Sequence, residues 1–317
     1  MAQKIIFKNK FLSFLILFIP FELSSSIDDY FPYDLSPTSS NYGEIGLMEM
    51  PTARLMEEGS LKFGISASYP NEYTYLVASP FSWFEATYRY TEQKNLKYGP
   101  ASYSGNQSMK DKGFDLKFKL LNESYYFPNL ALGIRDIAGT GTFSGEYLVG
   151  SKKMGRLDIS LGIGWGALGQ DRNIRNPFIS LGENFKIREF QAGQGGEFSV
   201  KNWFSGEKIA LFGGLEYGLP KYGFNLKLEY DTTNPDMGYS GPPIEVRSRF
   251  NYGITRSFGR LLDLGLSYER GSELRFSFSI KGNYGKEDLV PTTDPPKNVI
   301  ALDEQQKEKV RNDKGLL

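Results

Sequence analysis

The sequence predicts an all-β fold, a transmembrane antiparallel up-and-down β-barrel of about 12 strands. Three observations carry this prediction: short stretches in which apolar and polar residues alternate, connections that divide into short and long ones, and an export signal at the start. Composition agrees, because the 317 residues include 20 Tyr, 24 Phe and 35 Gly while the mean hydropathy stays at −0.39. Strands with one apolar and one polar face explain that mixture better than a bundle of membrane helices does.

Residues 1–26 are predicted to form a cleaved signal peptide. Three lysines precede the apolar run 11–19, and Ser24 and Ser26 provide a small-x-small cleavage site. The run is too short for a transmembrane helix, which needs about 20 apolar residues. Residues 27–59 follow and are rich in Ser, Pro and Asp. We expect them to enter the barrel lumen or to pack beneath it in the periplasm.

The predicted barrel covers residues 60–284. In 114–120, for example, apolar residues alternate with Asp115, Lys117 and Lys119. Because successive side chains of a strand point to opposite faces, each such stretch has an apolar and a polar face. The predicted strands are 61–69, 73–79, 84–90, 114–120, 130–136, 143–151, 155–165, 208–217, 222–230, 246–255, 262–269 and 274–283.

The connections between these stretches favour a membrane barrel with both termini in the periplasm. The long ones, 91–113, 166–207 and 231–245, are all odd-numbered, while the even-numbered ones are all short. A barrel of this type alternates short inner turns with longer outer loops. The alternative is a soluble sandwich or barrel whose apolar faces form the core. Aromatic residues near strand ends favour a membrane girdle instead: Tyr69, Tyr88, Tyr90, Trp165, Tyr217, Tyr230 and Tyr268.

Charged residues of the polar faces are predicted to line the lumen. This set comprises Glu85, Arg89, Asp115, Lys117, Lys119, Arg135, Glu146, Asp158, Glu216, Lys227, Glu229, Arg247, Arg249, Glu269 and Arg275. Under one hypothesis Lys117, Lys119, Arg247 and Arg249 contact acidic sugars in a polar passage, with Tyr and Trp stacking on the sugar faces. Under the other, opposed charges satisfy each other and fill a narrow barrel. We favour the second, because twelve strands enclose a limited lumen.

Several classes of chemistry are not expected. The chain has no cysteine and no histidine, which excludes disulfides, thiolate or imidazole metal sites, a serine-histidine hydrolase and a lipid anchor on cysteine. Lysine plus arginine equals aspartate plus glutamate at 37 each, so no net charge favours nucleic acid. The Gly-rich stretches 139–141 and 162–166 lack the context of a nucleotide site. We expect Gly to permit close packing there. A glycosidase pair such as Glu216 and Glu229 has low specificity as a signal.

Residues 285–317 are predicted to be a periplasmic linker and the start of a helix. The region contains Pro291 and the pair Pro295-Pro296, followed by the charged stretch 303–309. A proline-rich stretch before a charged, helix-prone one is typical of a linker leading into a further element.

Several stretches together resemble the YjbH family of outer-membrane proteins from exopolysaccharide gene clusters, which is also related to group 4 capsule secretion proteins. The stretches that carry the resemblance are 46–54 (GLMEMPTAR), 85–91 (EATYRYT), 132–143 (LGIRDIAGTGTF), 145–152 (GEYLVGSK), 161–166 (LGIGWG) and 212–217 (FGGLEY). The resemblance implies a barrel in the bacterial outer membrane. It also implies that longer members continue with a periplasmic segment and a second barrel-like half, so this chain is expected to be a fragment or a shortened relative.

The resemblance further implies a role in making or exporting an extracellular polysaccharide. We expect binding and passage without catalysis and without a cofactor, with outer-membrane lipid, a polysaccharide chain and other exopolysaccharide export proteins as partners. A general diffusion porin or structural outer-membrane protein is one alternative, and an outer-membrane enzyme acting on lipid or glycan is another.

Overall fold

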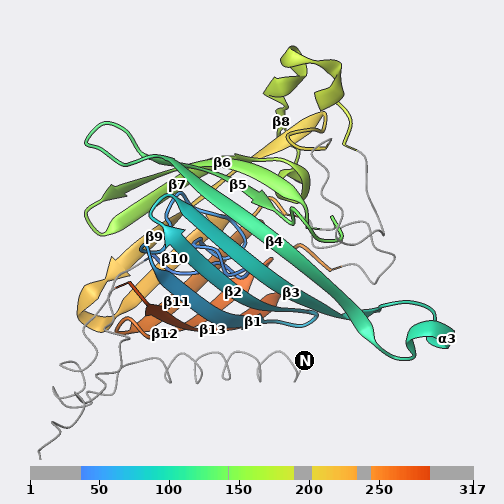
Figure 1. Cartoon of the computed structure of the whole chain (residues 1–317), viewed down its shortest axis with the longest axis horizontal. Coiled ribbons are helices and arrows are strands. Elements are labelled where there is room, and N and C mark those ends of the chain that lie inside the picture. Colours follow the sequence, from blue (N-terminus) through green and yellow to red (C-terminus); the bar gives the residue numbers. More distant parts are fainter. Residues whose placement is uncertain (1–36, 142, 189–201, 234–243, 286–317) are drawn as a thin grey trace, which may run out of the picture. The chain divides into compact units, whose positions relative to one another are not determined.

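Twelve antiparallel strands form a closed barrel in the computed structural model, which describes residues 37–141, 143–188, 202–233 and 244–285 (Figure 1). The strands of the wall are β1 (Ser60–Ala67), β2 (Asn71–Phe81), β3 (Phe84–Lys97), β4 (Ser108–Leu121), β5 (Asn129–Arg135), β6 (Gly145–Met154), β7 (Leu157–Gly164), β9 (Lys208–Leu219), β10 (Phe224–Tyr230), β11 (Phe250–Phe258), β12 (Leu262–Glu269) and β13 (Glu273–Asn283). Each strand pairs with its neighbours along the chain, and β13 pairs with β1 to close the wall. The predicted all-β up-and-down barrel of twelve strands is confirmed.

The remaining elements are short. The two-residue strand β8 (Ile174–Arg175) pairs with the beginning of β9. The helical turns are α3 (Ala101–Ser104), η1 (Gly166–Gly169), η2 (Pro177–Leu181), η3 (Glu183–Phe185) and η4 (Pro220–Tyr222). Among the described residues, none of these helices has the length and apolarity needed to cross a membrane.

The two rims of the barrel differ, as the connection lengths predict. One rim, here the turn end, holds Ser60, Asn283 and the short turns, in two of which Gly155 and Gly259 adopt positive φ angles of 62° and 58°. Glycine tolerates this backbone conformation, which tight hairpin turns require. The opposite rim, the loop end, holds the long connections 98–107, 165–207 and 231–249.

The apolar faces of the strands point away from the barrel interior. Phe63, Leu161, Phe276 and Ile280 are all exposed, while the charged residues between such positions are mostly buried. This arrangement is the reverse of a soluble barrel, in which the apolar face forms the core. The soluble sandwich alternative is therefore wrong.

The residues predicted to form an aromatic girdle lie in different environments. Tyr69, Tyr217 and Tyr268 are exposed on the outer surface, as such a girdle requires. Trp165 is instead the first residue of the 165–207 connection and is buried, with its ring stacked on that of Phe178 at 5.5 Å and edge-on to that of Phe204. Trp165 therefore belongs to the packing of this loop.

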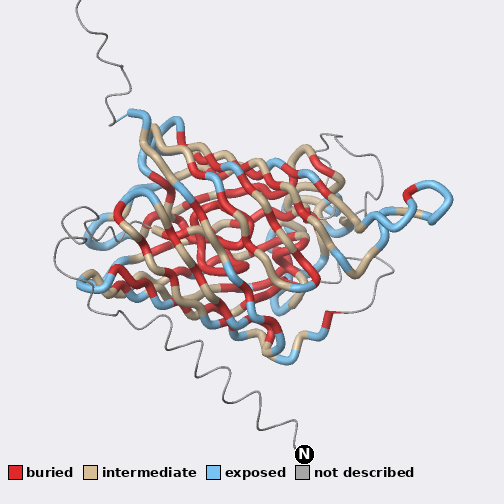
Figure 2. Tube along the Cα trace, turned by 90° about the horizontal axis from the view of Figure 1, so that it is seen from below, coloured by how far each residue is buried: buried red, intermediate tan, exposed pale blue. Residues whose placement is uncertain are grey.

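The interior of the barrel is filled by the chain that precedes β1. Residues 38–53, 55 and 56 of this chain are buried except for the half-buried Ser39, and Figures 1 and 2 show the trace inside the ring of strands. We call residues 38–56 the lumenal segment. The predicted signal peptide 1–26, residues 27–36 and the predicted linker from 286 onwards lie outside the described residues.

Candidate functional site

The candidate functional site is the lumen, where the lumenal segment rises from the turn end and returns to it. Near the loop end the ring of Tyr42 contacts those of Tyr73 at 4.9 Å and Phe143 at 6.5 Å. The segment then folds back on itself through two β-bridges, Ser39 with Ile45 and Gly46 with Pro51. It therefore forms a folded plug that spans most of the barrel height.

Two wall glutamates hold the backbone of the lumenal segment by accepting its amide protons. Glu229 on β10 accepts from the N–H groups of Met48 at 2.8 Å, Glu49 at 2.9 Å and Met50 at 3.1 Å. Glu85 on β3 accepts from Ile45 at 2.9 Å and from Met56 at 3.0 Å. Both carboxylates are buried, and hydrogen bonds of this kind offset the cost of removing them from water.

Two wall lysines hold the same segment by its carbonyl groups. Lys227 Nζ donates to the carbonyl oxygens of Ser39, Gly46 and Leu47 at 2.8 to 3.0 Å. Lys117 Nζ donates to Ile45 O at 2.5 Å and lies 3.5 Å from the Glu85 carboxylate. The lysines and glutamates therefore bind peptide groups that a buried irregular segment cannot satisfy by itself.

Glu44 of the lumenal segment forms a buried cluster with two wall residues. Its carboxylate accepts from Arg135 Nε at 2.7 Å and from the Tyr147 hydroxyl at 2.5 Å. Burial alone would raise the pKa of Glu44, but the positive charges of Arg135 and Lys117 lower it below its usual value. The carboxylate is thus held ionised inside the barrel.

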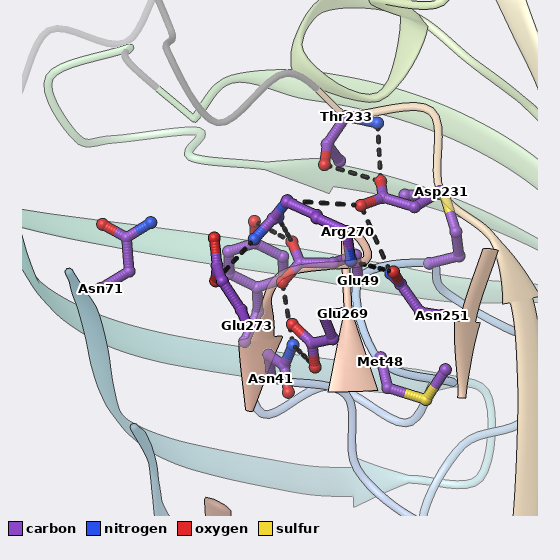
Figure 3. A network of polar contacts seen from close by, with 12 residues as sticks. Asn41, Met48, Glu49, Asn71, Asp231, Thr233, Asn251, Glu269, Arg270 and Glu273 are labelled. Atoms are coloured by element: carbon purple, nitrogen blue, oxygen red, sulfur yellow. Dashed lines mark hydrogen bonds and ion pairs between the residues drawn. The ribbon is translucent and has the colours of Figure 1, made fainter. Parts of the chain in front are cut away.

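A second buried cluster lies nearer the loop end (Figure 3). Arg270, which follows β12, lies 3.1 Å from the Glu49 carboxylate and 3.6 Å from that of Asp231. Asn41 donates to both Glu49 and Glu269 at 2.8 and 2.9 Å. Burial raises the pKa of Glu49, but the charges of Arg270 and Arg275 together with the hydrogen bonds from Asn41 and Tyr42 outweigh this effect and lower the pKa below its usual value.

Arg54 fixes the returning part of the segment at the turn end. Its Nε donates to Asp158 on β7 at 2.7 Å, and its Nη1 lies 2.7 Å from Glu123 in the turn between β4 and β5. One guanidinium therefore joins the lumenal segment to two separate parts of the wall, with the paired geometry that arginine favours.

Apolar packing completes the lumen between these polar clusters. Leu47, Met50 and Ala53 of the segment form one buried cluster with wall residues that include Tyr147 and Phe212. These large inward rings fit because they lie over glycines of the neighbouring strands. Phe212 covers its β7 partner Gly162, where a Cβ atom would lie 2.4 Å from the ring. The predicted role of Gly in close packing is confirmed at this position.

Most of the predicted lumen-lining residues therefore bind the lumenal segment or its neighbours. Direct contacts come from Glu85, Lys117, Arg135, Asp158, Lys227, Glu229 and Glu269. Arg89 lies over the Tyr42 ring at 4.9 Å, Asp115 lies 3.5 Å from Arg89, and Arg275 donates to Glu269 at 3.0 Å. Lys119 and Glu216 are half-buried on the same inner face nearer the turn end, where Glu216 accepts from Thr38 Oγ1 of the segment at 3.5 Å.

Three predicted positions require correction. Glu146 faces outward, because the inward positions of β6 are Tyr147, Val149 and Ser151. Its carboxylate is buried by Arg188 of the 165–207 loop, which donates to it at 2.8 and 3.0 Å. An outward charge is tolerated there because the loop supplies its partner.

Arg247 and Arg249 precede β11, which begins at Phe250 and not at 246 as predicted. Arg247 is exposed beside Glu245, and Arg249 is a partly exposed residue that donates to Thr233 O at 2.5 Å. Together with the positions of Lys117 and Lys119, this means that the four proposed sugar contacts do not line one open passage. The favoured hypothesis of opposed charges is incomplete too, because the lumenal segment lies between them.

The sequence reasoning missed Lys62 and Arg270. Lys62 on β1 is buried and donates to Ser39 Oγ at 2.6 Å. It occupies a polar position of an alternating stretch, so the same pattern could have identified it. Arg270 lies outside any strand at a positive φ of 54°, which no alternation indicates. Among the described residues, no group of acidic side chains is placed to hold a metal ion.

Comparison with known proteins gives a family and a relative. Residues 38–315 match the YjbH family, described as "Exopolysaccharide biosynthesis protein YbjH". The protein named "Uncharacterized lipoprotein YjbH" from Escherichia coli (strain K12) is 39% identical over 265 residues, which are 83% of this chain and 37% of that protein. The chain thus spans little more than a third of the length of this relative.

Solved porin structures align with much of the chain at low similarity. The KdgM porin in complex with disordered oligogalacturonate aligns over 70% of this chain and 97% of its own, with 9% identity and a TM-score of 0.35. The NanC porin aligns over the same shares with 9% identity and a TM-score of 0.33.

Proposed function

Because the chain belongs to the YjbH exopolysaccharide biosynthesis family, we propose that it is a bacterial outer-membrane β-barrel that assists the export or assembly of an extracellular polysaccharide. The family match over residues 38–315 is the observation that carries the proposal. The protein acts by binding and without bond chemistry, and its partners are outer-membrane lipid, the polysaccharide and other export proteins.

The outer surface supports the membrane location. Exposed Phe, Leu, Ile and Tyr side chains occur on most of the wall strands, from Phe63 on β1 to Ile280 on β13. A soluble monomer rarely exposes so much contiguous apolar surface, because such a surface is unfavourable in water. A barrel without open edges also satisfies its own backbone hydrogen bonds, as the interior of a bilayer demands.

The filled lumen supports a role for the rims of the barrel. The charged groups that would line an open channel, Lys117, Lys227, Glu85 and Glu229, are bonded to the lumenal segment. The barrel therefore assists export from its rims, and passage through the lumen requires the segment to leave. The same observation argues against a general diffusion porin.

Deletion of the gene, with complementation by the full chain, tests the proposal. We expect less surface polysaccharide, or polysaccharide released into the medium, and recovery on complementation. Membrane fractionation and a heat-modifiable gel shift should place the folded protein in the outer membrane. Unchanged polysaccharide amount and attachment in the deletion strain would contradict the role, and recovery in the soluble fraction would contradict the location.

A further inference from the structure

A cavity of about 320 Å³ opens at the turn end, beside the lumenal segment. It lies between Pro37 and Arg54 on one side and the β6–β7 and β9–β10 hairpins on the other. We call it the turn-end pocket. Its volume is at the lower end of the range for ligand pockets, roughly 300–1,000 Å³, which fits one or two sugar rings better than an extended chain.

Asn225 on β10 leaves a donor unused in the wall of this pocket. Its side chain is only 3% exposed, and its Nδ2 atom has no hydrogen-bond partner among the described residues. A buried amide without a partner is unfavourable, and such groups in native proteins usually bind water or a ligand. Asn225 therefore provides a donor for a polar ligand.

Glu216 on β9 contributes an acceptor to the same pocket. Among the described residues its carboxylate oxygens accept only from Thr38 Oγ1, at the long distance of 3.5 Å. A carboxylate can accept about four hydrogen bonds, so most of this capacity is free. An amide donor and a carboxylate acceptor in one small cavity suit the vicinal hydroxyl groups of a sugar.

Two cations at the mouth of the pocket add a preference for a negative ligand. Lys153 and Arg156, in and beside the turn between β6 and β7, are exposed and form no ion pair with any described residue. Arg54 and Asp158 neutralise each other across the pocket wall. The charges of the pocket that have no ion-pair partner among the described residues are therefore two positive ones, Lys153 and Arg156, and one negative one, Glu216. A guanidinium such as that of Arg156 binds carboxylates in a bidentate manner.

We propose that the turn-end pocket binds one acidic sugar unit, a hexuronate, of a glycan that approaches from the turn end. Asn225 and Glu216 bind its ring hydroxyls, Arg156 and Lys153 bind its carboxylate, and Pro37 and Pro220 contact its apolar ring face. This inference rests on the proposed function and deepens it, because it assigns a sugar class and a side of the barrel to the interaction.

Equilibrium binding to the refolded full chain in detergent tests the pocket with three probes: glucuronate, glucose and inorganic phosphate. We expect glucuronate to bind more tightly than the other two. Arg156→Ala should weaken glucuronate binding about tenfold or more, because it removes a hydrogen bond to a charged group. Asn225→Ala should weaken it by about two- to tenfold, because it removes a hydrogen bond to a neutral hydroxyl. Arg247→Ala, which removes an exposed arginine at the loop end, should leave it unchanged.

Three outcomes would overturn the proposal: no glucuronate binding, equal loss in all three variants, or phosphate binding as tight as that of glucuronate with the same dependence on Arg156. The last outcome would identify a general anion site. A heat-modifiable gel shift checks folding, and Arg156→Ala on its own decides the question if Asn225→Ala does not fold, because Arg156 lies in an exposed turn. If the pocket does not bind glucuronate, the expected result of gene deletion stays the same. The two experiments therefore test the pocket and the export role separately.

Discussion

The guanidinium of Arg135 on the barrel wall donates to the carboxylate of Glu44 inside the lumen at 2.7 Å. Both side chains are buried, and they lie 91 positions apart in the sequence, so this ion pair joins the lumenal segment to a distant strand of the wall. It represents the general arrangement of the lumen, in which charges of the wall are neutralised by the chain that precedes the first strand.

Glu44→Ala should therefore destabilise the barrel strongly. Removing one partner of a buried ion pair leaves the other charge unpaired, which lowers the free energy of unfolding by about 3–5 kcal/mol. Urea unfolding followed by gel shift measures the change. Glu245→Ala serves as the control, because its pair with Arg247 is exposed and such pairs contribute about 0–1 kcal/mol. Equal unfolding midpoints for the two variants would show that the buried charge of Arg135 does not need Glu44 as its partner.

Glu229→Gln should loosen the lumenal segment without changing the shape of the wall. The amide replaces one of the two oxygens that accept the N–H groups of Met48, Glu49 and Met50 with an NH2 group. Because an NH2 group donates and cannot accept these hydrogen bonds, we expect more frequent opening and a higher ion conductance in planar bilayers. Glu72→Gln, at an exposed pair with Lys94, is the matched control. Conductance at the control level would argue that Glu229 does not hold the segment.

A disulfide can lock the lumenal segment in place, because the natural chain has no cysteine. The Ala53 amide donates to Ser151 Oγ at 2.8 Å, so Ala53→Cys combined with Ser151→Cys should crosslink under oxidising conditions. If the barrel assists export from its rims, surface polysaccharide should stay at the wild-type level in the locked protein. A loss of polysaccharide that reductant reverses, and that neither single variant shows, would mean that the segment must leave the lumen.

Acid should weaken the docking of the lumenal segment. The pKa values of Glu44 and Glu49 are lowered in the folded protein from 4.5, their usual value, because the neighbouring cations outweigh the effect of burial. Their stabilisation is complete above pH 4.5 and is lost as the pH falls through the lowered folded values. The difference in unfolding free energy between the wild type and Glu44→Ala should therefore become smaller as the pH falls from 6 to 3, and this difference isolates Glu44 from the other buried carboxyl groups. A difference that does not change with pH would contradict the lowered pKa of Glu44.

Gly133→Ala should impair folding, whereas Gly282→Ala should be tolerated. Gly133 on β5 pairs with Tyr147 on β6, and a Cβ atom at this position would lie 2.0 Å from the Tyr147 ring. No atom lies within 4 Å of the corresponding position at Gly282 on β13. The folded fraction after refolding, measured by gel shift, compares the two variants. Equal yields would mean that the Tyr147 ring moves aside at little cost.

The strands could be predicted from the sequence because each one carries its own signal. The alternation in 114–120 arises because the pleat of a strand points successive side chains to a polar interior and to an apolar exterior. It can be recognised without knowing which strands pair with this one. The pattern is less informative at the loop end, where the predicted start of β11 lies four residues before the observed one. There the alternation of apolar and polar residues continues into residues 246–249, which have no partner strand.

The lumen could be predicted only in part, because its contacts join residues far apart in sequence. The inward position of Lys117 follows from alternation, but its bond to the carbonyl of Ile45 depends on the path of a segment without any period. Glu146 shows a second difficulty. Its charge suggests an inward position, but the side chain lies on the outer face, where Arg188 from a distant loop neutralises it. Alternation gives the face of a side chain and not its partner.

The position of the lumenal segment next to β1 has a consequence for assembly. The seam of the wall joins β1 to β13, so the last strand made must meet the strand that directly follows the segment. Without the lumenal segment, groups such as Lys227 and Glu229 would lack the peptide partners that they have in the folded protein. We therefore expect the chain inside to act as a template that is enclosed before the cylinder is sealed.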